Sequence, residues 1–418
     1  MDALIDVPAE LIIAIASLCH RKTLRALAET NRRCCQLVQP LVFQTVRISS
    51  ITQLRHLAQF FMAREDIGRK VTSISIEAKS LIEQAFDLDS TIQGDIIDNL
   101  KQVLSSSRAK RLSFKGLGGG MHGSCINHCC LAKSLVELVS ITVERGLRTL
   151  KIVDSMVSLW SMIDLLSVLG DHDMDALELL CCAPTPTSRD EMDLHSFDAE
   201  NVLHRVSDYL DRRATTVSTK QLWFKIIRLF ACDLFCAIIA GYVKAVGRCH
   251  VVSMLFWCQE NAVLRWWLEV MAKKEGFVEG LKTIWMIHPG VGCAMSFVSE
   301  SLRNLSHLNH GLQQIGFTVV DWHNFDPISF YTVALKNDYL KVLWTTHSSW
   351  KGVGAEVGRS AFWDATTRLE NGHLEDSCLL KELFLHGHLS RLDRWSSEYG
   401  VRDLRYVVDM VEMGYTDA

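Results

Sequence analysis

The sequence lacks a dense stripe of basic residues. Its 44 lysines and arginines are outnumbered by 48 aspartates and glutamates, and the formal net charge at pH 7 is −4. Proteins that bind nucleic acid concentrate lysine and arginine on one surface, often between aromatic residues, because that surface must contact phosphates. The sequence shows no such concentration, so we expect no nucleic-acid partner.

Signals for secretion and for membrane insertion are also missing. The N-terminus carries Asp2 and Asp6 where a secretory signal would be basic, and its apolar run, Leu11 to Leu18, is too short to span a bilayer. A longer apolar stretch, Leu229 to Val243, is interrupted by Asp233 and predicts a buried helix rather than a membrane span. We therefore expect no membrane partner, and a location in the cytoplasm, the nucleus or both.

A disulfide framework is not evident, although the chain has 14 cysteines. Three pairs are adjacent in sequence and none fits the regular spacing of short secreted proteins. These pairs are Cys34-Cys35, Cys129-Cys130 and Cys181-Cys182. We expect a reducing compartment, in which most cysteines act as small buried hydrophobic residues.

Familiar catalytic spacings are absent as well, including His-Glu-x-x-His and Gly-x-Ser-x-Gly. The glycine-rich run Gly116 to Gly120 has no following Lys-Ser/Thr, which favours a connecting loop over a phosphate-binding loop. His122, Cys125 and Cys129 are candidate zinc ligands without a second matching pair; the alternative is a loop followed by a helix that buries Cys129 and Leu131. We expect no enzyme activity, no catalytic residue, no cofactor and no bound metal.

What the sequence does contain is apolar residues in quantity. At 418 residues, of which 48% are apolar, the chain exceeds what one hydrophobic core usually serves. Charged residues make up 22%, close to the average for globular proteins, which argues against bulk disorder. Two or more units, or an array of repeats, are therefore expected.

The first forty-odd residues predict three short helices. Pro8 and Glu10 suit the first turn of a helix, because proline loses no useful N–H there and a carboxylate complements the positive end of the helix dipole. A second helix is expected from Thr23 as N-cap, and a third from about Asn31 to an end at Pro40. Three such helices are too small to bury all their apolar residues, and this leftover surface predicts docking to a partner.

A resemblance supports that prediction. The run Val7-Pro8-x-Glu10-Leu11-x-x-x-Ile15, then Leu18, Lys22-x-Leu24-x-x-Leu27 and Arg32-Arg33, resembles the F-box motif, and the continuation Gln39 to Ile48 is similar to fungal members of that family. The resemblance implies binding to the Skp-type adaptor of a cullin–RING ligase. The adaptor-binding residues would be Val7, Pro8, Leu11, Ile15, Leu18, Leu24 and Leu27. The alternative is a three-helix cap that seals a larger core.

The rest of the chain repeats a short pattern, apolar-x-x-apolar-x-apolar, between segments with helical spacing. The pattern is clear at Leu147-x-x-Leu150-x-Ile152, and its second position falls at Ile74, Leu112, Leu150, Leu177, Leu222, Leu255, Ile284, Thr318, Leu343 and Leu383. At Leu112 the first position is weak, at Arg108. If these triads are strands, their central residues should be buried side by side on parallel strands.

Strand and helix alternating in this way resembles leucine-rich repeats, in which each unit adds one strand to a curved parallel sheet. The expected fold is α/β: a three-helix F-box over residues 1–48, followed by an irregular leucine-rich-repeat-like solenoid. A polar insert over 183–220, with a short helix near Glu200 to Arg212, divides the array into parts spanning 49–182 and 221–418. A non-repetitive α/β or mostly helical domain is the alternative.

These features favour a substrate-recognition adaptor of an SCF-type ubiquitin ligase, which binds the Skp-type adaptor, and through it the cullin scaffold, with its N-terminal helices. Its C-terminal array would present a protein substrate whose identity the sequence does not indicate. Such a receptor needs no catalytic residue, because it contributes proximity and orientation. The alternatives are an F-box scaffold without a role in ubiquitination, and a metal-binding or enzymatic α/β protein.

Overall fold

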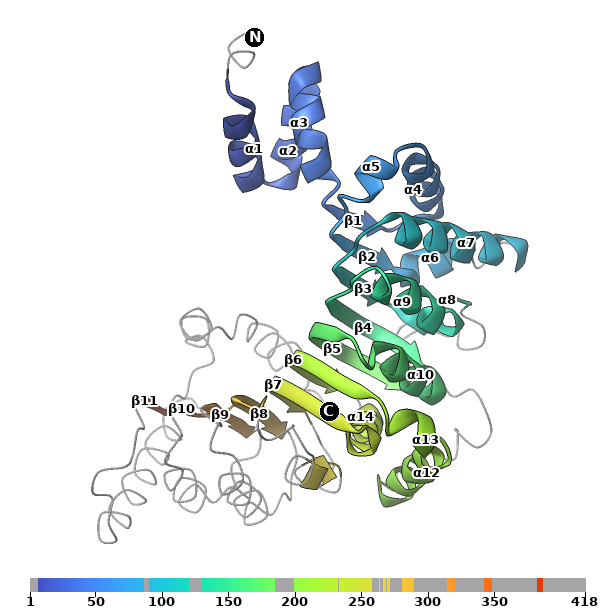
Figure 1. The fold of residues 1–418 in the computed structure, drawn as a ribbon, viewed down its shortest axis with the longest axis vertical. Helices are drawn as coiled ribbons and strands as arrows, with labels where there is room; N and C mark the ends of the chain where they lie inside the picture. The colour runs from blue at the N-terminus through green and yellow to red at the C-terminus, as the bar shows by residue number, and fades with distance from the viewer. Residues whose placement is uncertain are drawn as a thin grey trace. The chain divides into compact units, whose positions relative to one another are not determined.

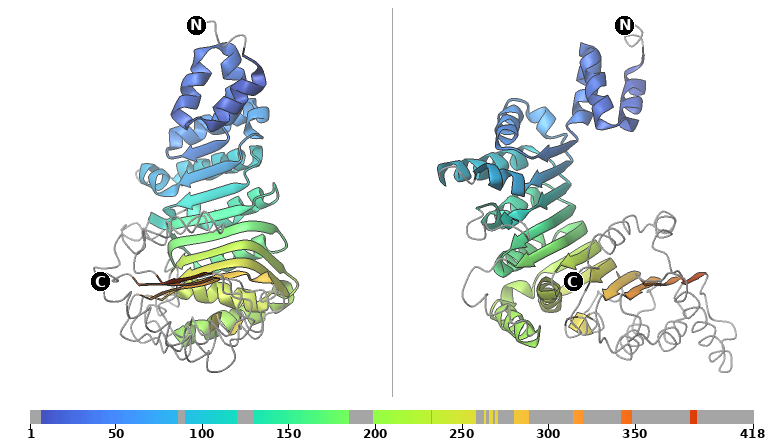
Figure 2. Two further views of the ribbon diagram at one scale, coloured as in Figure 1. Left: turned by 90° about the vertical axis from the view of Figure 1, so that its left-hand side faces the viewer. Right: turned by 180° about the vertical axis from the view of Figure 1, so that it is seen from behind.

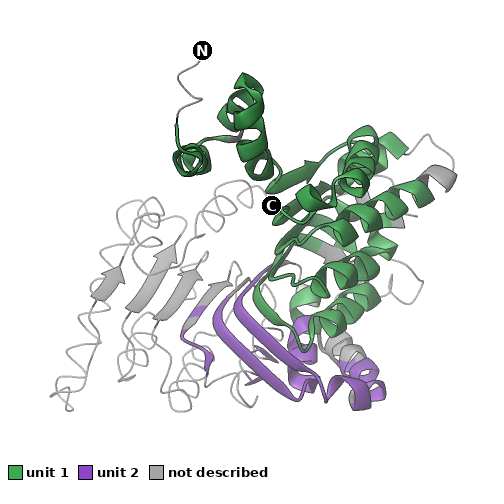
Figure 3. Cartoon of the chain, turned by 45° about the horizontal axis from the view of Figure 1, so that its top comes forward, with its two compact units in different colours: residues 1–197, 230–238 green, residues 198–229, 239–418 purple. Residues whose placement is uncertain are grey.

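The computed structural model describes residues 7–85, 90–119, 130–184, 199–231, 233–257, 263, 266–267, 269–270, 280–288, 314–319, 342–347 and 382–385. It is a mixed α/β protein whose strands pair in parallel (Figure 1), so the expected α/β class is confirmed. The chain divides into unit 1, residues 1–197 and 230–238, and unit 2, residues 198–229 and 239–418 (Figure 3). Within the described residues, no helix is both long enough and apolar enough to cross a membrane.

Unit 1 begins with three short helices and continues as a parallel sheet with a helical segment after each of its first four strands. The N-terminal helices are α1 (Ala9–Leu18), α2 (Arg21–Thr30) and α3 (Arg32–Val42). The strands are β1 (Thr45–Ile48), β2 (Ser73–Glu77), β3 (Arg111–Lys115), β4 (Thr149–Val157) and β5 (Asp173–Pro184). The connecting helices are α4 (Ile51–Ala63), α5 (Glu65–Gly68), α6 (Ala78–Ala85), α7 (Ser90–Ser106), the 3₁₀ turn η2 (Leu117–Gly119), α8 (Cys130–Lys133), α9 (Leu135–Val143) and α10 (Leu159–Leu169).

A ladder of aliphatic side chains runs across the unit 1 sheet. Each member is the register partner of the next, and all are at most 3% exposed; in strand order they are Val46, Ile74, Leu112, Leu150 and Leu177. A second ladder lies two residues further along each strand, at Ile48, Ile76, Phe114, Ile152 and Leu179. Alternate residues of a strand point to one face, so both ladders lie on the face that the helices cover (Figure 1). The predicted strand positions in unit 1 are confirmed.

The residues just before successive strands are also hydrogen-bonded to one another. The carbonyl of Gln44 accepts from the amide of Thr72 at 2.9 Å, the carbonyl of Thr72 from Lys110 at 2.8 Å, and the carbonyl of Lys110 from Arg148 at 2.8 Å. One residue earlier lies a row of buried apolar side chains: Val71, Ala109, Leu147 and Met174. The first triad position before β3 is therefore Ala109, which is 1% exposed, rather than Arg108, which is exposed.

Unit 2 contains α12 (Ala199–Arg212), α13 (Ala214–Val217), most of β6 (Gln221–Ala231), the end of α14 (Asp233–Ala245), β7 (Arg248–Trp257), β8 (Thr283–His288), β9 (Gln314–Val319), β10 (Val342–His347) and β11 (Glu382–Leu385). From β6 to β11 each strand pairs in parallel with the next. Ile284, Leu343 and Leu383 lie on these strands as expected, and the helix expected near Glu200 to Arg212 is α12.

Two details of unit 2 differ from the sequence-based expectations. Met254, not Leu255, is the register partner of Ile284, and it is fully buried. In β9 the residue aligned with Ile284 and Leu343 is Ile315, three positions before the expected Thr318. Apolar-rich strands offer several triads in overlapping frames, and only pairing with the neighbouring strand selects one.

The apolar stretch Leu229 to Val243 was expected to form one helix. Its first residues instead complete β6, which ends at Ala231, and α14 begins at Asp233. The helical part is buried as expected, with Ile238, Ala240 and Val243 all fully buried. A continuous apolar run is compatible with a buried strand as well as a buried helix, so hydropathy alone cannot place the boundary.

Candidate functional site

An exposed apolar stripe lies on helix α1. Leu11, Ile15 and Leu18 occur at i, i+4 and i+7, so they share one side of the helix, and they are 54%, 56% and 89% exposed. Pro8, exposed as well, is the N-cap residue, and its carbonyl accepts from the amides of Leu11 and Ile12 at 3.1 and 3.2 Å. Exposed leucines and isoleucines aligned on one helix face are typical of a protein-binding surface. We call Pro8, Leu11, Ile15 and Leu18 the α1 stripe.

The interior of the three-helix module lies against a different side of α1. Ile12, Ala16, Cys34 and Val38 form a buried cluster, all at most 2% exposed. Val7, Leu24 and Leu27 are half-buried and pack against this cluster. The seven residues expected to bind the adaptor therefore fall into two groups: the four of the α1 stripe are exposed, and these three mainly support the module's own core.

Local capping separates the short helices of this module from one another along the chain. The Asn31 side chain accepts from the amide of Cys34 at 2.8 Å, which caps α3 and separates it from α2. Helix α2 begins at Arg21 with His20 as N-cap, so the expected cap at Thr23 is wrong. Pro40 does not end α3 either: it lies inside the last turns of a helix that continues to Val42.

An aromatic cluster connects the module to the first helix of the sheet region. Phe43, the C-cap residue of α3, stacks on Phe60 of α4 with ring centroids 5.1 Å apart and an interplanar angle of 23°. Phe61 lies edge-on to Phe43 at 6.4 Å and is fully buried. Such pairs contribute beyond their buried area. Sequence spacing does not predict these ring contacts, because Phe43 is more than fifteen residues away from Phe60 and Phe61 along the chain.

The glycine-rich run after β3 forms a tight turn. Gly116 and Gly118 have φ angles of +73° and +75°, which side chains rarely allow. A Cβ atom at Gly116 would lie 2.6 Å from the Cβ of Lys79, and one at Gly118 would lie 2.7 Å from the carbonyl oxygen of Met156. The turn thus needs these glycines for close packing. Gly120 and the candidate zinc ligands His122, Cys125 and Cys129 lie outside the described residues.

Cysteines in the described part of the chain are free thiols. Cys34, Cys182, Cys236 and Cys249 are buried, as expected for small hydrophobic residues. Cys181 is half-buried, and its pKa is raised by burial and by the charge of Asp154. In the described ranges, no group of three or more His, Cys, Asp or Glu side chains could hold a metal ion.

The second surface of interest is the open face of the unit 1 sheet, opposite the helices (Figure 2). Side chains there alternate with the buried ladders and are mostly polar; one row consists of the register partners Arg47, Ser75, Ser113, Lys151 and Glu178. Arg47 Nε lies 3.2 Å from Glu77 Oε1, and Lys151 Nζ lies 3.4 Å from Glu178 Oε2. The apolar spacing in the sequence predicted the buried residues of each strand. It did not predict the residues of the open face, because these show no apolar periodicity.

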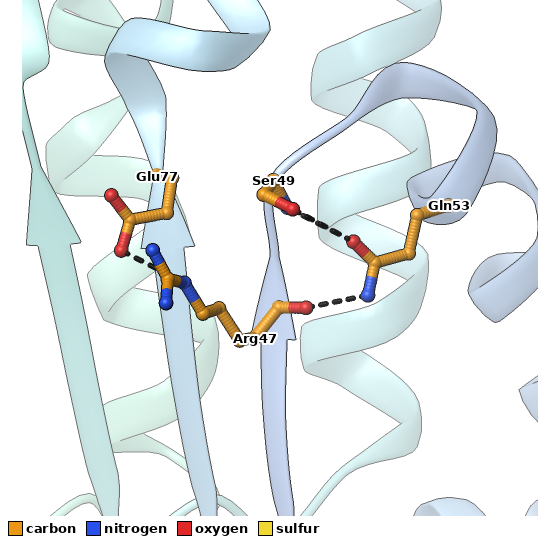
Figure 4. Close-up of polar contacts among 4 residues, drawn as sticks. All are labelled: Arg47, Ser49, Gln53 and Glu77. Carbon is orange, nitrogen blue, oxygen red and sulfur yellow. Dashed lines mark hydrogen bonds and ion pairs between the residues drawn. The ribbon is translucent and has the colours of Figure 1, made fainter.

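Strand β1 forms the edge of this sheet, and a side chain covers part of it (Figure 4). In a parallel pair, alternate residues direct their backbone groups toward the neighbour. Gln44 bonds to β2, so Arg47 and Ser49 direct theirs away from it. The Gln53 side chain meets both: Nε2 donates to the Arg47 carbonyl at 2.6 Å, and Oε1 accepts from the Ser49 amide at 3.0 Å. Gln53 therefore occupies an edge that could otherwise pair with another strand.

Comparison of the sequence with models of protein families and with curated proteins found no match. The two surfaces that the geometry distinguishes are thus the α1 stripe, which is apolar, and the open face, which is polar and carries several cations. The first suits a partner that buries apolar surface, and the second a partner that presents charge and hydrogen-bonding groups.

Proposed function

We propose that the three-helix module docks a Skp-type adaptor through the α1 stripe, and that the protein acts as the substrate-recognition subunit of an SCF-type cullin–RING ubiquitin ligase. The observation that carries this proposal is the exposure of Leu11, Ile15 and Leu18 on one side of α1, beside Pro8. These are positions at which the sequence resembles the F-box. Support comes from the module's interior, which is complete without them.

The energetics fit a docking role. Full burial of one leucine or isoleucine side chain contributes about 1.5–3 kcal/mol. Three such residues on one helix face offer a partner a substantial gain, of which part offsets the entropy lost on association. A structural cap would instead bury these side chains in its own chain, and within the described residues they remain exposed.

The second half of the proposal concerns the remaining chain. We propose that residues 49–182 and 221–418 form an irregular leucine-rich-repeat-like array that presents the substrate. Parallel strands in register, with helices on one face of the unit 1 sheet, support this proposal. The intervals from Ile74 to Leu112 and from Leu112 to Leu150 exceed the roughly 20–29 residues of standard leucine-rich repeats. The extra length lies in the helical connections. The protein would act in the cytoplasm or nucleus, with no chemistry of its own.

The test is a double substitution in the stripe, Pro8→Ala with Leu11→Asp. A carboxylate at position 11 would have to enter an apolar contact, where it either stays charged without water or takes up a proton, and both cost free energy. We expect adaptor affinity to fall by at least about 2 kcal/mol, which is about thirtyfold. Co-purification of the Skp-type adaptor and titration calorimetry with the full chain measure it.

Met62→Asp is the matched control. Met62 is 68% exposed on α4, outside the module, so this variant adds the same charge at an apolar surface position and should keep full affinity. Thermal unfolding of the sheet region should be unchanged in both variants. Undiminished adaptor binding by the Pro8→Ala, Leu11→Asp protein would contradict the proposal, as would equal loss in the Met62→Asp control.

A further inference from the structure

The open face of the unit 1 sheet has an excess of positive charge centred on β3. Arg111 and Lys115 are both exposed and lie on the same side of the strand, with Ser113 between them. Within the part of the chain that the structure describes, neither side chain forms an ion pair or a hydrogen bond.

The carboxylates of the open face do not neutralise these two cations. Glu77 is the register partner of Lys115, but its carboxylate pairs with Arg47 at 3.2 Å (Figure 4). Glu178 is 9% exposed and pairs with Lys151. The acids of this face are thus already engaged, and β3 presents two uncompensated charges to solvent.

The spacing of the two cations indicates the kind of ligand. Residues four apart on a strand are separated by about 13 Å, at roughly 3.3 Å per residue. No single small anion reaches both at that separation. An extended peptide that follows the strand would place two acidic side chains four residues apart at the same distance and on the same face.

The surroundings of the two cations also suit a polypeptide. Ser75 and Ser113 are register partners, half-exposed, and their hydroxyl groups can both donate and accept hydrogen bonds. Neighbouring Ser73 and Thr149, the two register partners of Arg111, add further hydroxyl groups. The open face of β2 and β3 has no large apolar side chain, so the bound segment itself is polar.

We infer that the open face of β2–β4, centred on Arg111 and Lys115, binds an extended acidic segment of a partner protein, with carboxylates at positions i and i+4. This deepens the proposed function, on which the identification of that partner as a ubiquitination substrate rests. Cation–carboxylate pairs supply selection and rapid association, and the hydroxyl groups of β2 and β3 bind the polar segment between the carboxylates.

The experiment uses the full chain and three fluorescein-labelled nonapeptides, with binding measured by fluorescence anisotropy. The first has glutamates at positions 3 and 7 in a serine–threonine background; the second has glutamines there; the third has its two glutamates adjacent. We expect the first to bind about tenfold more tightly than the other two. Raising the salt to 1 M, where the Debye length is about 3 Å, should abolish the difference.

Arg111→Glu with Lys115→Glu should reduce binding of the first peptide at least about tenfold, because two attractions become repulsions. The control, Lys79→Glu with Lys133→Glu, has the same net charge but changes exposed lysines on α6 and α8, and it should bind normally. Equal binding of the three peptides, or undiminished binding by the Arg111/Lys115 variant, would overturn the inference.

A ten-nucleotide oligothymidylate tests the other class of polyanion. If it binds through Arg111 and Lys115 as tightly as the first peptide, the surface is a general anion site and the inference is wrong. Adaptor capture separates this inference from the proposed function. The Arg111/Lys115 variant should still capture the Skp-type adaptor. A chain that binds the peptide but no adaptor would retain this inference and remove the ligase proposal.

Discussion

Helices α1 and α10 have a similar share of apolar residues and different surroundings. Both are short and mostly apolar. In α10 six apolar side chains are at most 5% exposed, whereas in α1 only Ile12 and Ala16 are buried and the α1 stripe remains open. The difference comes from the neighbours: α10 packs beside α9 in the layer that covers the sheet, whereas among the described residues the buried side of α1 packs against side chains of α2 and α3. Apolar content therefore does not show whether a helix completes a core or offers a binding surface.

A charge placed on the buried helix, α10, should have the largest effect on stability. Leu166 of α10 is 1% exposed, and Leu166→Asp would place a carboxylate among apolar side chains. We expect a loss of about 4 kcal/mol or more in the free energy of unfolding, seen as a lower urea midpoint for the sheet region. A loss below about 1 kcal/mol would mean that the covering layer is far looser than the packing indicates.

A change in the module's local structure should have an intermediate effect. Asn31→Ala removes the side-chain bond to the Cys34 amide and leaves the start of α3 without its cap. We expect a loss of about 1 kcal/mol, confined to the module. Hydrogen exchange should accelerate at amides of α1–α3 and stay unchanged in β4. Equal acceleration in β4 would show that the module and the sheet unfold together, which would favour the cap alternative.

The smallest effect is expected on the exposed side of the comparison. Leu18 is 89% exposed, so Leu18→Asp makes the same chemical change as Leu166→Asp at a position in water. The free energy of unfolding, measured by urea denaturation, should change by no more than about 0.5 kcal/mol. If Leu18→Asp destabilises the chain as much as Leu166→Asp does, the stripe is part of a core and cannot serve as a docking surface.

Much of the unit 1 sheet could be predicted from local spacing. Leu150 and Leu177 were placed correctly because a strand that packs on helices buries every second residue, and that period is visible in sequence. The same method placed Leu255 and Thr318 wrongly in unit 2, where apolar residues allow more than one frame. For the candidate adaptor site, the sequence predicted seven residues but not which of them are exposed, since Leu24 and Leu11 belong to the same motif and differ only in what packs on them.

The sequence by itself determined three short N-terminal helices and a series of parallel strands separated by helices, because helix and strand periods depend on neighbours within a few residues. The tertiary structure alone decided which apolar side chains stay in water. It also brought Arg111 and Lys115 onto an open face and placed the amide of Gln53 against the free edge of β1. The physical reason is the same in each case: burial, charge balance and edge pairing depend on residues that are distant in sequence and become neighbours only when the strands align in register.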